Sequence, residues 1–342
     1  MNKVRLGRTG LMVSALGFGG IPIQRLTTAE AVAVVRASLD AGINLLDTAH
    51  GYSSSEERIG LAIQGRREGL VIATKAPSTD PQQFREQVEL SFRRLQVERI
   101  DLLQFHGVSS PEKYAAVLAP GGPLAIAREL QAAGRIGHIG VTSHNLGVAL
   151  QMARDNHFET LMFPFNFITR EPLDELIPLC RQNDIGFIAM KPVGGGLLWD
   201  IEVALKWLRQ TPGIVPLVGM QSLEELVQNL AAIQGPAELT ADELALIAQR
   251  RDELGTRFCR ACDYCQPCPQ GIAISSVLRI QSFFRRMPAD RFYSAGTAAS
   301  IATAETCIEC GECESRCPYD LPIREMLKEQ TAWYRQMEAT RS

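Results

Sequence analysis

Short apolar runs alternate with helix-like patterns along residues 14–234 of the chain. Each apolar run is continuous rather than alternating with polar residues, which is typical of parallel strands buried on both faces of a sheet. We therefore expect eight strands, at Ala15 to Phe18, Ile43 to Asp47, Leu70 to Lys75, Ile100 to His106, Ile136 to Thr142, Thr160 to Phe163, Ile185 to Met190 and Ile214 to Gly219.

The segments between these runs carry helix start signals. Thr27 and Glu30 have the spacing of a capping box, and Asp80-Pro81 supplies an N-cap and a first-turn proline for the next helix. Eight strand–helix units in about 220 residues match a (β/α)8 TIM barrel, which typically takes about 250 residues. A doubly wound open sheet is the rival, but Gly17 to Gly20 are not followed by a good phosphate-binding helix start.

A second, smaller domain follows the barrel. Thr240 and Glu243 form another capping-box pair, and the helix that they open is expected to end near Gly255. We place the boundary there, with a barrel at 1–255 and a small domain at 256–342. An amphipathic stretch from Ile274 to Met287 lies between two groups of cysteines. This domain therefore resembles a helical dicluster ferredoxin module rather than a compact β-rich ferredoxin.

Eight of the nine cysteines lie in two short runs, each ending in Cys-Pro. Three thiolates spaced three residues apart can wrap one face of an iron–sulfur cubane, and the cysteine before proline serves the other cluster in two-cluster ferredoxins. We therefore assign two [4Fe–4S] clusters, one to Cys259, Cys262, Cys265 and Cys317, and the other to Cys307, Cys310, Cys313 and Cys268. Zinc and disulfides are the alternatives. Zinc sites usually pair two CxxC units, and disulfides need an exported chain.

Composition narrows the choice of partners and compartment. A net charge of −3 gives no electrostatic case for nucleic acid or an anionic membrane. No stretch approaches the ~20 apolar residues of a membrane span, and the first residues lack the apolar region of a signal peptide. Thiolate-bound clusters without an export signal imply a reducing cytoplasm. We expect Cys180, the ninth cysteine, to be a core residue.

Polar residues follow three successive strands of the expected barrel. Asp47, Lys75 and His106 end the second, third and fourth strands, and Tyr52 lies in the loop after the second. Barrel active sites lie at this end of the strands. A neighbouring ammonium lowers the pKa of a phenol, so Tyr52 can act as general acid for carbonyl reduction and as general base for the reverse. His106 would orient the carbonyl.

These residues lie in segments that resemble the aldo-keto reductase family. The matching segments, in order, are Asp47-Thr48-Ala49-x-x-Tyr52 with Ser55-Glu56, then Ala73-Thr74-Lys75, then Asp101-Leu102-Leu103-Gln104-x-His106. With the cysteines, the chain resembles the subgroup that is fused to a ferredoxin-type domain. The resemblance implies an NAD(P)H-dependent oxidoreductase that acts on a small carbonyl or alcohol. The alternative for His106 is a satisfied core histidine, and Lys75 can also snorkel.

The resemblance also implies the nicotinamide contacts. They are expected at the ends of several strands and at the helix start that follows the eighth strand. The residues expected to make them are Gly19, Thr142, Ser143, Met190, Lys191, Gly219, Gln221, Ser222, Glu225 and Asn229. Met190 stands where many relatives have a stacking aromatic, and Met162 stands where a glutamine is common. His144 has no assigned role, and a helix-start role is the alternative to a substrate contact.

Glu225 bears on the choice between NAD and NADP. Relatives that prefer NADP often have Lys or Arg at the positions of Gln221 or Glu225, to pair with the 2′-phosphate. A carboxylate close to the ribose suits hydroxyls better, so we expect a weakened NADP preference. The alternative is that Ser222-x-x-Glu225 is simply a capping box.

Three functions remain open at this point. The clusters exchange electrons with a redox protein partner or another cofactor, or they are structural or redox-sensing in a carbonyl reductase, or the chain is a regulatory binding module. A flavin would link hydride and single-electron transfer, although the sequence contains no flavin-binding signature. Four acidic residues lie near the second cysteine run: Glu305, Glu309, Glu312 and Glu314. They either dock a basic partner or form a solvated face, and a solvated face is the commoner case.

Overall fold

The computed structural model describes residues 1–340. It divides into two compact units, Met1–Leu239 and a second unit that begins at Thr240, which are described separately below. The sequence places the domain boundary near residue 255, whereas the structure groups the helix α10 (Ala241–Leu254) with the second unit. Only Ile247 of this helix is fully buried, and an exposed helix of this kind leaves little apolar pattern from which to assign it to either domain.

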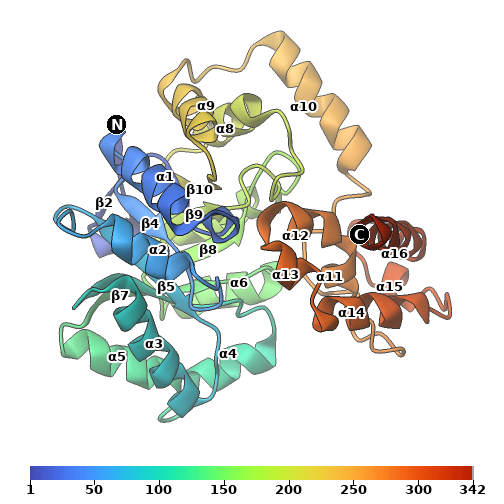
Figure 1. Cartoon of the computed structure of the whole chain (residues 1–342), viewed down its shortest axis with the longest axis horizontal. Coiled ribbons are helices and arrows are strands. Elements are labelled where there is room, and N and C mark those ends of the chain that lie inside the picture. Colours follow the sequence, from blue (N-terminus) through green and yellow to red (C-terminus); the bar gives the residue numbers. More distant parts are fainter. Residues whose placement is uncertain (341–342) are drawn as a thin grey trace. The chain divides into compact units, whose positions relative to one another are not determined.

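The first unit is a closed barrel of eight parallel strands, as the sequence predicts (Figure 1). The barrel excludes the open doubly wound sheet, because β3 and β10 pair and close the ring. Each strand overlaps one of the expected apolar runs. The strands are β3 (Gly17–Gly19), β4 (Leu45–Asp47), β5 (Val71–Ala76), β6 (Ile100–Phe105), β7 (Ile136–Thr142), β8 (Thr160–Pro164), β9 (Gly186–Met190) and β10 (Ile214–Gly219).

Helices cover the outside of the barrel (Figure 1). Thr27 and Glu30 form the expected capping box, and Asp80 caps the helix that begins at Pro81. The α-helices of this unit are α1 (Thr28–Asp40), α2 (Ser55–Ala62), α3 (Pro81–Leu95), α4 (Pro111–Leu118), α5 (Pro123–Ala132), α6 (Leu146–Asp155), α7 (Leu176–Gln182), α8 (Ile201–Arg209) and α9 (Leu223–Gln234). Three 3-10 helices, η1 (Gly7–Thr9), η2 (Pro22–Arg25) and η3 (Glu171–Leu173), complete the unit.

The barrel has an apolar layer on each side of its strands. The outer layer lies between strands and helices and includes Cys180, which is buried as expected; burial raises the pKa of its thiol to about 12. The inner layer fills the barrel. Packing there is tight at Gly140, because a Cβ atom at this position would lie 2.1 Å from Thr160 Oγ1.

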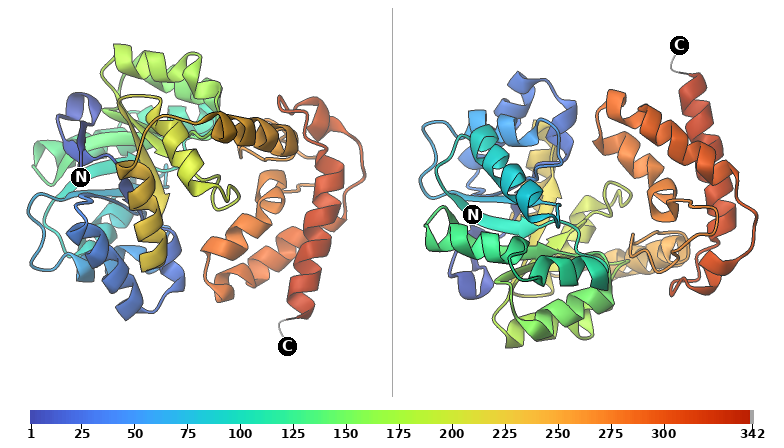
Figure 2. Two further views of the ribbon diagram at one scale, coloured as in Figure 1. Left: turned by 90° about the horizontal axis from the view of Figure 1, so that it is seen from above. Right: turned by 90° about the horizontal axis from the view of Figure 1, so that it is seen from below.

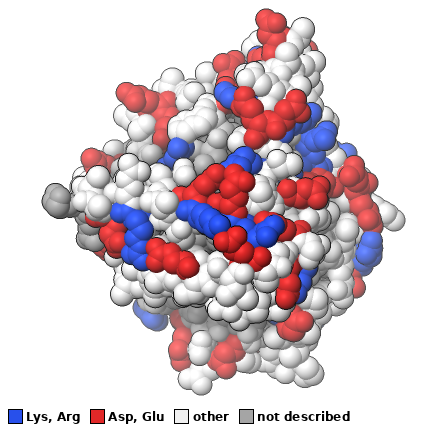
Figure 3. Space-filling view, turned by 90° about the vertical axis from the view of Figure 1, so that its right-hand side faces the viewer, with Lys and Arg blue, Asp and Glu red and all other residues white. Residues whose placement is uncertain are grey.

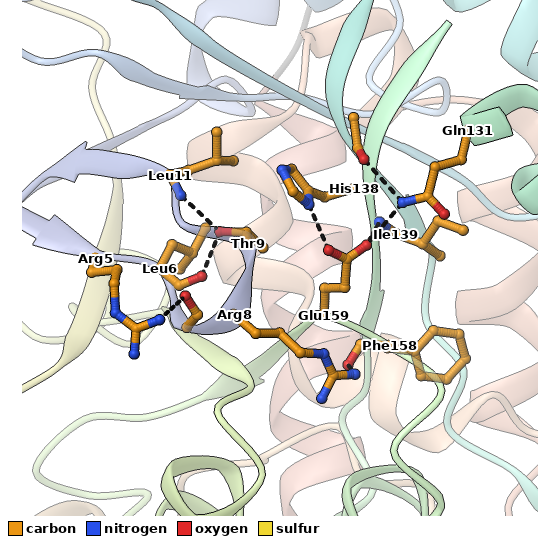
Figure 4. Close-up of polar contacts among 12 residues, drawn as sticks. Arg5, Leu6, Arg8, Thr9, Leu11, Gln131, His138, Ile139, Phe158 and Glu159 are labelled. Carbon is orange, nitrogen blue, oxygen red and sulfur yellow. Dashed lines mark hydrogen bonds and ion pairs between the residues drawn. The ribbon is translucent and has the colours of Figure 1, made fainter. Parts of the chain in front are cut away.

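A short antiparallel hairpin precedes the barrel, and the sequence analysis treats it only as a leading segment. Its strands are β1 (Lys3–Arg5) and β2 (Met12–Ser14). Leu6, in the connection, is fully buried in the inner layer of the barrel. Arg8 in the same connection donates to the Phe158 carbonyl at 2.7 Å (Figure 4). The hairpin is therefore tied to the barrel by apolar packing and by hydrogen bonds.

The second unit is helical, as expected. After α10 it comprises α11 (Ile274–Leu278), α12 (Ile280–Arg286), α13 (Ala289–Phe292), α14 (Ala295–Glu305), α15 (Glu312–Ser315) and α16 (Ile323–Ala339), the long red helix of Figure 2. The amphipathic stretch from Ile274 is thus two short helices that meet at Arg279. Its core joins apolar side chains of α11, α14 and α16 to most of the cysteines. No helix among residues 1–340 has the length and apolarity needed to cross a membrane.

Candidate functional site

A buried ion pair lies at the ends of β4 and β5. The Lys75 ammonium pairs with Asp47 Oδ1 and donates to the Thr48 carbonyl at 2.7 Å. Only 2% of the Lys75 side chain and 4% of the Asp47 side chain are exposed. Lys75 therefore does not snorkel to solvent, and its ammonium is fixed inside the barrel.

Gln104 holds the other oxygen of the Asp47 carboxylate. Its Nε2 donates to Asp47 Oδ2 at 2.9 Å, and its side chain is completely buried on β6. Lys75 is its partner in the register between β5 and β6. Sequence analysis gives Gln104 only as part of a motif, since its partner depends on this register.

The electrostatics favour a charged lysine. Burial lowers the pKa of Lys75, but the charges of Asp47, Tyr52 and Glu56 outweigh burial and raise it. Burial raises the pKa of Asp47, while Lys75 and Gln104 act in the opposite direction. Because the lysine pKa is raised above its ordinary high value, the ammonium persists at neutral pH and holds its counter-ion.

Tyr52 and His106 lie beside this pair. The Lys75 nitrogen is 5.1 Å from the centroid of the Tyr52 ring. The Tyr52 and His106 rings meet edge to face, with centroids 5.7 Å apart and planes at 81°. The four residues that the sequence analysis singles out are therefore gathered in one place, and His106 follows directly after β6.

The loop that carries Tyr52 is held by buried hydroxyl groups. Thr48 Oγ1 donates to Ser55 Oγ at 2.9 Å, and Ser55 Oγ donates to the Gly20 carbonyl at 2.7 Å. Backbone bonds from Tyr52 to Ala49 and from Ser55 to Tyr52 close two successive turns. These contacts fix the backbone of Tyr52 between β4 and α2.

His106 is neutral under ordinary conditions. Burial, followed by the charges of Lys75 and Lys113, lowers the pKa of His106 to about 3. At neutral pH the imidazole carries one proton, and it can donate one hydrogen bond and accept another. It is therefore suited to orienting a polar group rather than to acting as a cationic acid.

The neutral state of His106 predicts a pH dependence of stability. A histidine pKa that is lower in the folded protein than in the unfolded chain costs stability as the pH falls below about 6.5 toward 3, because the unfolded chain binds the extra proton. Between pH 7 and pH 5, the free energy of unfolding should fall by about 1–2 kcal/mol more in the wild type than in His106→Gln. Urea unfolding at both pH values measures this, and equal losses in the two proteins would contradict it.

The expected nicotinamide contacts on β7 are buried. Thr142 Oγ1 accepts from the Gly107 backbone N–H at 2.8 Å, so its hydroxyl proton is still available to a ligand. Ser143 is completely buried and its hydroxyl donates to the Asn145 carbonyl at 3.2 Å. His144 donates its backbone N–H to Ser109 Oγ at 2.9 Å.

The later strand ends differ in exposure. Met190 and Lys191 at the end of β9 are half-buried, and the backbone of Lys191 is left-handed with φ of 54°. Met162 is buried in the inner layer of the barrel. Gly19 and Gly219 pair across β3 and β10.

The start of α9 contains the polar residues expected to contact the adenosine half of a dinucleotide. Ser222 caps this helix, and its Oγ accepts from the Glu225 N–H at 3.1 Å. The Glu225 carboxylate accepts from the backbone and the side chain of Gln221 at 2.8 and 3.2 Å. Asn229 on the same helix is 2% exposed, and its Oδ1 has no hydrogen-bond partner among residues 1–340.

The eight clustered cysteines fall into two groups of four in the second unit. Each group lines its own cavity, and each contains three cysteines of one run and the last cysteine of the other. One cavity is lined by Cys259, Cys262, Cys265 and Cys317, and the other by Cys268, Cys307, Cys310 and Cys313. We call them the first and the second cysteine cavity. This is the exchange of the fourth cysteine that the sequence predicts.

Two thiols of the first cysteine cavity lie in surroundings that disfavour a free thiolate. Burial raises the pKa of Cys262 to about 11 and that of Cys265 to about 12. Thiolates in such surroundings need the positive charge of bound metal.

The acidic residues near the second cysteine run are all paired with bases. In the face shown in Figure 3, acidic and basic side chains lie next to one another. The pairs are Glu305 with Arg335, Glu309 with Lys328, Glu312 with Arg316, and Glu314 with Arg324. They do not form an uncompensated acidic patch for a basic partner.

The comparisons with known proteins agree with this architecture. A model of the aldo/keto reductase family matches residues 15–200, which is more than half of the 342 residues. The chain belongs to the aldo/keto reductase family. A model of a 4Fe-4S dicluster domain matches residues 258–322 of this aldo/keto reductase. The predicted fusion of a reductase barrel with an iron–sulfur domain is confirmed.

Curated relatives resemble the barrel part of this aldo/keto reductase. An uncharacterized oxidoreductase of Bacillus subtilis is 30% identical over an alignment of 214 residues, and the match covers 58% of this chain and 67% of the relative. An NADH-specific methylglyoxal reductase of Escherichia coli is 27% identical over an alignment of 228 residues, and the match covers 58% of this chain and 69% of the relative. The chain thus spans about two thirds of the length of each relative.

A solved structure also matches the fold. The aldo/keto reductase of Klebsiella pneumoniae in complex with NADP and acetate has a TM-score of 0.61 and 25% identity, covering 73% of this chain and 95% of its own. The family and the fold together identify the protein as an oxidoreductase with an appended iron–sulfur domain.

Proposed function

We propose that the barrel catalyses nicotinamide-dependent reduction of a small carbonyl compound, or the reverse oxidation of an alcohol. The observation that carries the proposal is the fixed Lys75 ammonium beside the Tyr52 ring, within a buried ion pair. Anaerobically purified full-length protein, mixed with NADH and methylglyoxal or other small aldehydes, should consume NADH. Absence of turnover across such a panel would contradict the proposal.

Tyr52 supplies the proton in this mechanism. When bound, NAD(P)H supplies a hydride to the carbonyl carbon. The Tyr52 hydroxyl gives its proton to the carbonyl oxygen, and the Lys75 ammonium stabilises the phenolate that remains. The electrostatic coupling that raises the pKa of Lys75 also favours an ionised Tyr52, since the interaction is mutual.

The other residues position these two. Asp47 keeps Lys75 in place and charged, and Gln104 fixes the remaining carboxylate oxygen. Neutral His106 donates a hydrogen bond to the carbonyl oxygen, which selects the orientation of the substrate. In the reverse direction the Tyr52 phenolate accepts the alcohol proton.

The dinucleotide is held by the barrel ends and α9. The buried Asn229 amide is suited to an adenine group, since its Oδ1 is free to accept a hydrogen bond. The hydroxyl of Thr142, which accepts a bond from Gly107 and can still donate one, would bind the carboxamide together with Ser143. The half-buried Met190 would pack against the nicotinamide ring without stacking. Gly19, Lys191 and Gly219 complete the expected contacts.

We further propose that NADH is the better substrate. The family resemblance implies that a 2′-phosphate would approach Glu225, and two hydrogen bonds from Gln221 hold its carboxylate at the helix start. The name of the Escherichia coli relative, an NADH-specific reductase, supports this preference, while the complex of the Klebsiella relative contains NADP.

Reversing the charge at Glu225 tests the preference. We expect Glu225→Lys to shift the ratio of NADPH to NADH affinity about tenfold toward NADPH, because a repulsive charge becomes an attractive one. Glu224→Lys, an exposed neighbour on the same helix, is the matched control. Fluorescence titration of both dinucleotides measures the ratio, and tenfold tighter NADPH binding by the wild type would contradict the assignment of Glu225.

We propose that the second unit binds two [4Fe–4S] clusters that transfer single electrons to a partner redox protein. The four-cysteine lining of each cavity supports this. Coupling to hydride transfer requires a two-to-one electron converter such as a flavin. Bleaching of the clusters by NADH under anaerobic conditions would support coupling; if they do not bleach, a structural or sensing role is favoured.

A further inference from the structure

The two cysteine cavities differ in their charged surroundings. The first cysteine cavity has a buried and a half-buried arginine close to it, Arg260 and Arg279, whereas the arginine at the second, Arg324, is neutralised by an acid. Because the reduced form of a [4Fe–4S] cluster carries one more negative charge than the oxidised form, nearby charge shifts its reduction potential. This inference rests on the proposed binding of two clusters.

Arg260 lines the first cysteine cavity directly. It lies between Cys259 and Cys262 in sequence, and the residue is only 8% exposed. Its guanidinium lies 3.7 Å from the centroid of the Tyr319 ring, which comes two residues after Cys317. The charge is therefore held against both segments that supply cysteines to this cavity.

Arg279 approaches the same cavity from the break between α11 and α12. Its Nε donates to the Ser275 carbonyl at 2.9 Å, and both Ser275 and Leu278 line the cavity. Burial lowers the pKa of Arg279, while the nearby Cys259 sulfur and the Asp263 carboxylate oppose that effect. Asp263 is exposed, so water screens its charge more than that of the arginine.

Arg324 is the charged residue that lines the second cysteine cavity. Its guanidinium is bound to the Glu314 carboxylate at 2.7 and 2.9 Å, and its backbone N–H donates to the same carboxylate at 2.9 Å. The pair adds no net charge to this cavity. Cys310 and Ile308, which also line it, are exposed.

We infer that Arg260 and Arg279 raise the reduction potential of the cluster in the first cysteine cavity above that of its neighbour, so that the first cluster is the electron acceptor of the pair. A one-electron donor of low potential would reduce the cluster in the second cavity, where Cys310 and Ile308 are exposed, and the electron would then pass to the oxidised cluster in the first. No bond is made or broken and no proton is taken up. The two arginines are positioning residues for charge, since neither supplies a ligand.

The test is a potentiometric titration of the anaerobic full-length protein with dithionite, monitored by EPR. The wild type is expected to show two midpoints. Arg279→Gln should lower the higher midpoint potential by about 59 mV. For one electron this shift corresponds to an about tenfold smaller equilibrium constant for electron transfer between the clusters. Arg260→Gln should act on the same midpoint, and Cys310→Ser, which perturbs the second cavity, identifies the other signal.

Two further variants separate charge from structure. Arg279→Lys retains the charge and is expected to keep the wild-type midpoint. The two Arg279 variants together still test the role of charge if Arg260→Gln fails to fold. Arg335→Gln removes an arginine of α16 whose side chain is 40% exposed and paired with Glu305, and it should move neither midpoint.

The outcomes distinguish this inference from the function on which it rests. Midpoints that do not move in Arg279→Gln, that move together, or that move equally in Arg279→Lys would overturn the role of the arginines. A wild-type protein with iron for only one cluster would overturn the two-cluster proposal itself, and this inference with it.

Discussion

Replacing Tyr52 with phenylalanine is expected to lower the rate of carbonyl reduction by about 10²- to 10⁴-fold, the usual contribution of a positioned general acid. The substitution removes only the hydroxyl. The edge contact with His106 and the approach of Lys75 to the ring involve the ring itself, so the variant should retain the geometry of the site. Steady-state kinetics with NADH and methylglyoxal measures the loss.

The controls for this prediction separate chemistry from folding and binding. NADH affinity, measured by fluorescence, should stay within about twofold of the wild type, a difference of less than 0.5 kcal/mol. Tyr114→Phe removes a hydroxyl of the same kind from α4, where it donates to Asp155 at 2.8 Å, and it should keep its activity. A Tyr52→Phe enzyme with near-normal turnover would mean that another group supplies the proton.

Lys75 should be as important as Tyr52 but for a different reason. Without its ammonium the phenolate that forms during reduction loses its stabilising charge, and the buried Asp47 carboxylate loses its counter-ion. A loss of activity accompanied by a loss of stability is therefore expected for Lys75→Met. Tyr52→Phe should show the loss of activity alone, which distinguishes the proton donor from the residue that supports it.

Much of the barrel follows from the sequence because its strands are buried on both faces. A continuous apolar run such as Ile136 to Thr142 is then sufficient to place a strand, and the observed β7 covers the same residues. The grouping of Asp47, Lys75 and His106 also follows, because parallel strands in a barrel end on one face. Capping boxes at Thr27 and Thr240 set two helix starts for local reasons.

Features that depend on three-dimensional contacts are not visible in the pattern. The hairpin of β1 and β2 has strands of three residues, which are too short for a periodicity. The bond from Gln104 to Asp47 and the contact of Arg260 with Tyr319 join residues that are far apart in sequence. The break at Arg279 interrupts a stretch whose apolar spacing continues through it. The contacts to the dinucleotide remain predictions.

Serine in place of one cysteine from each cavity should remove or strongly perturb one cluster at a time. We expect the iron content to fall from about eight to about four atoms per chain when a ligand is lost. Cys180→Ser is the matched control, because Cys180 lies in the barrel core, outside both cavities. Iron and sulfide analysis with EPR of anaerobically purified protein measures the outcome.

The most informative variants are those of the exchanged cysteines. Cys317 is the last cysteine of the second run but lines the first cysteine cavity, so Cys317→Ser should change the same EPR signal as Cys262→Ser. Cys268→Ser should instead match Cys310→Ser. If each cluster were bound within its own run, these pairings would be reversed. The comparison therefore decides how the two runs share their ligands, and it does not require activity of the barrel. An unchanged iron content in all four variants would argue against iron–sulfur clusters in either cavity.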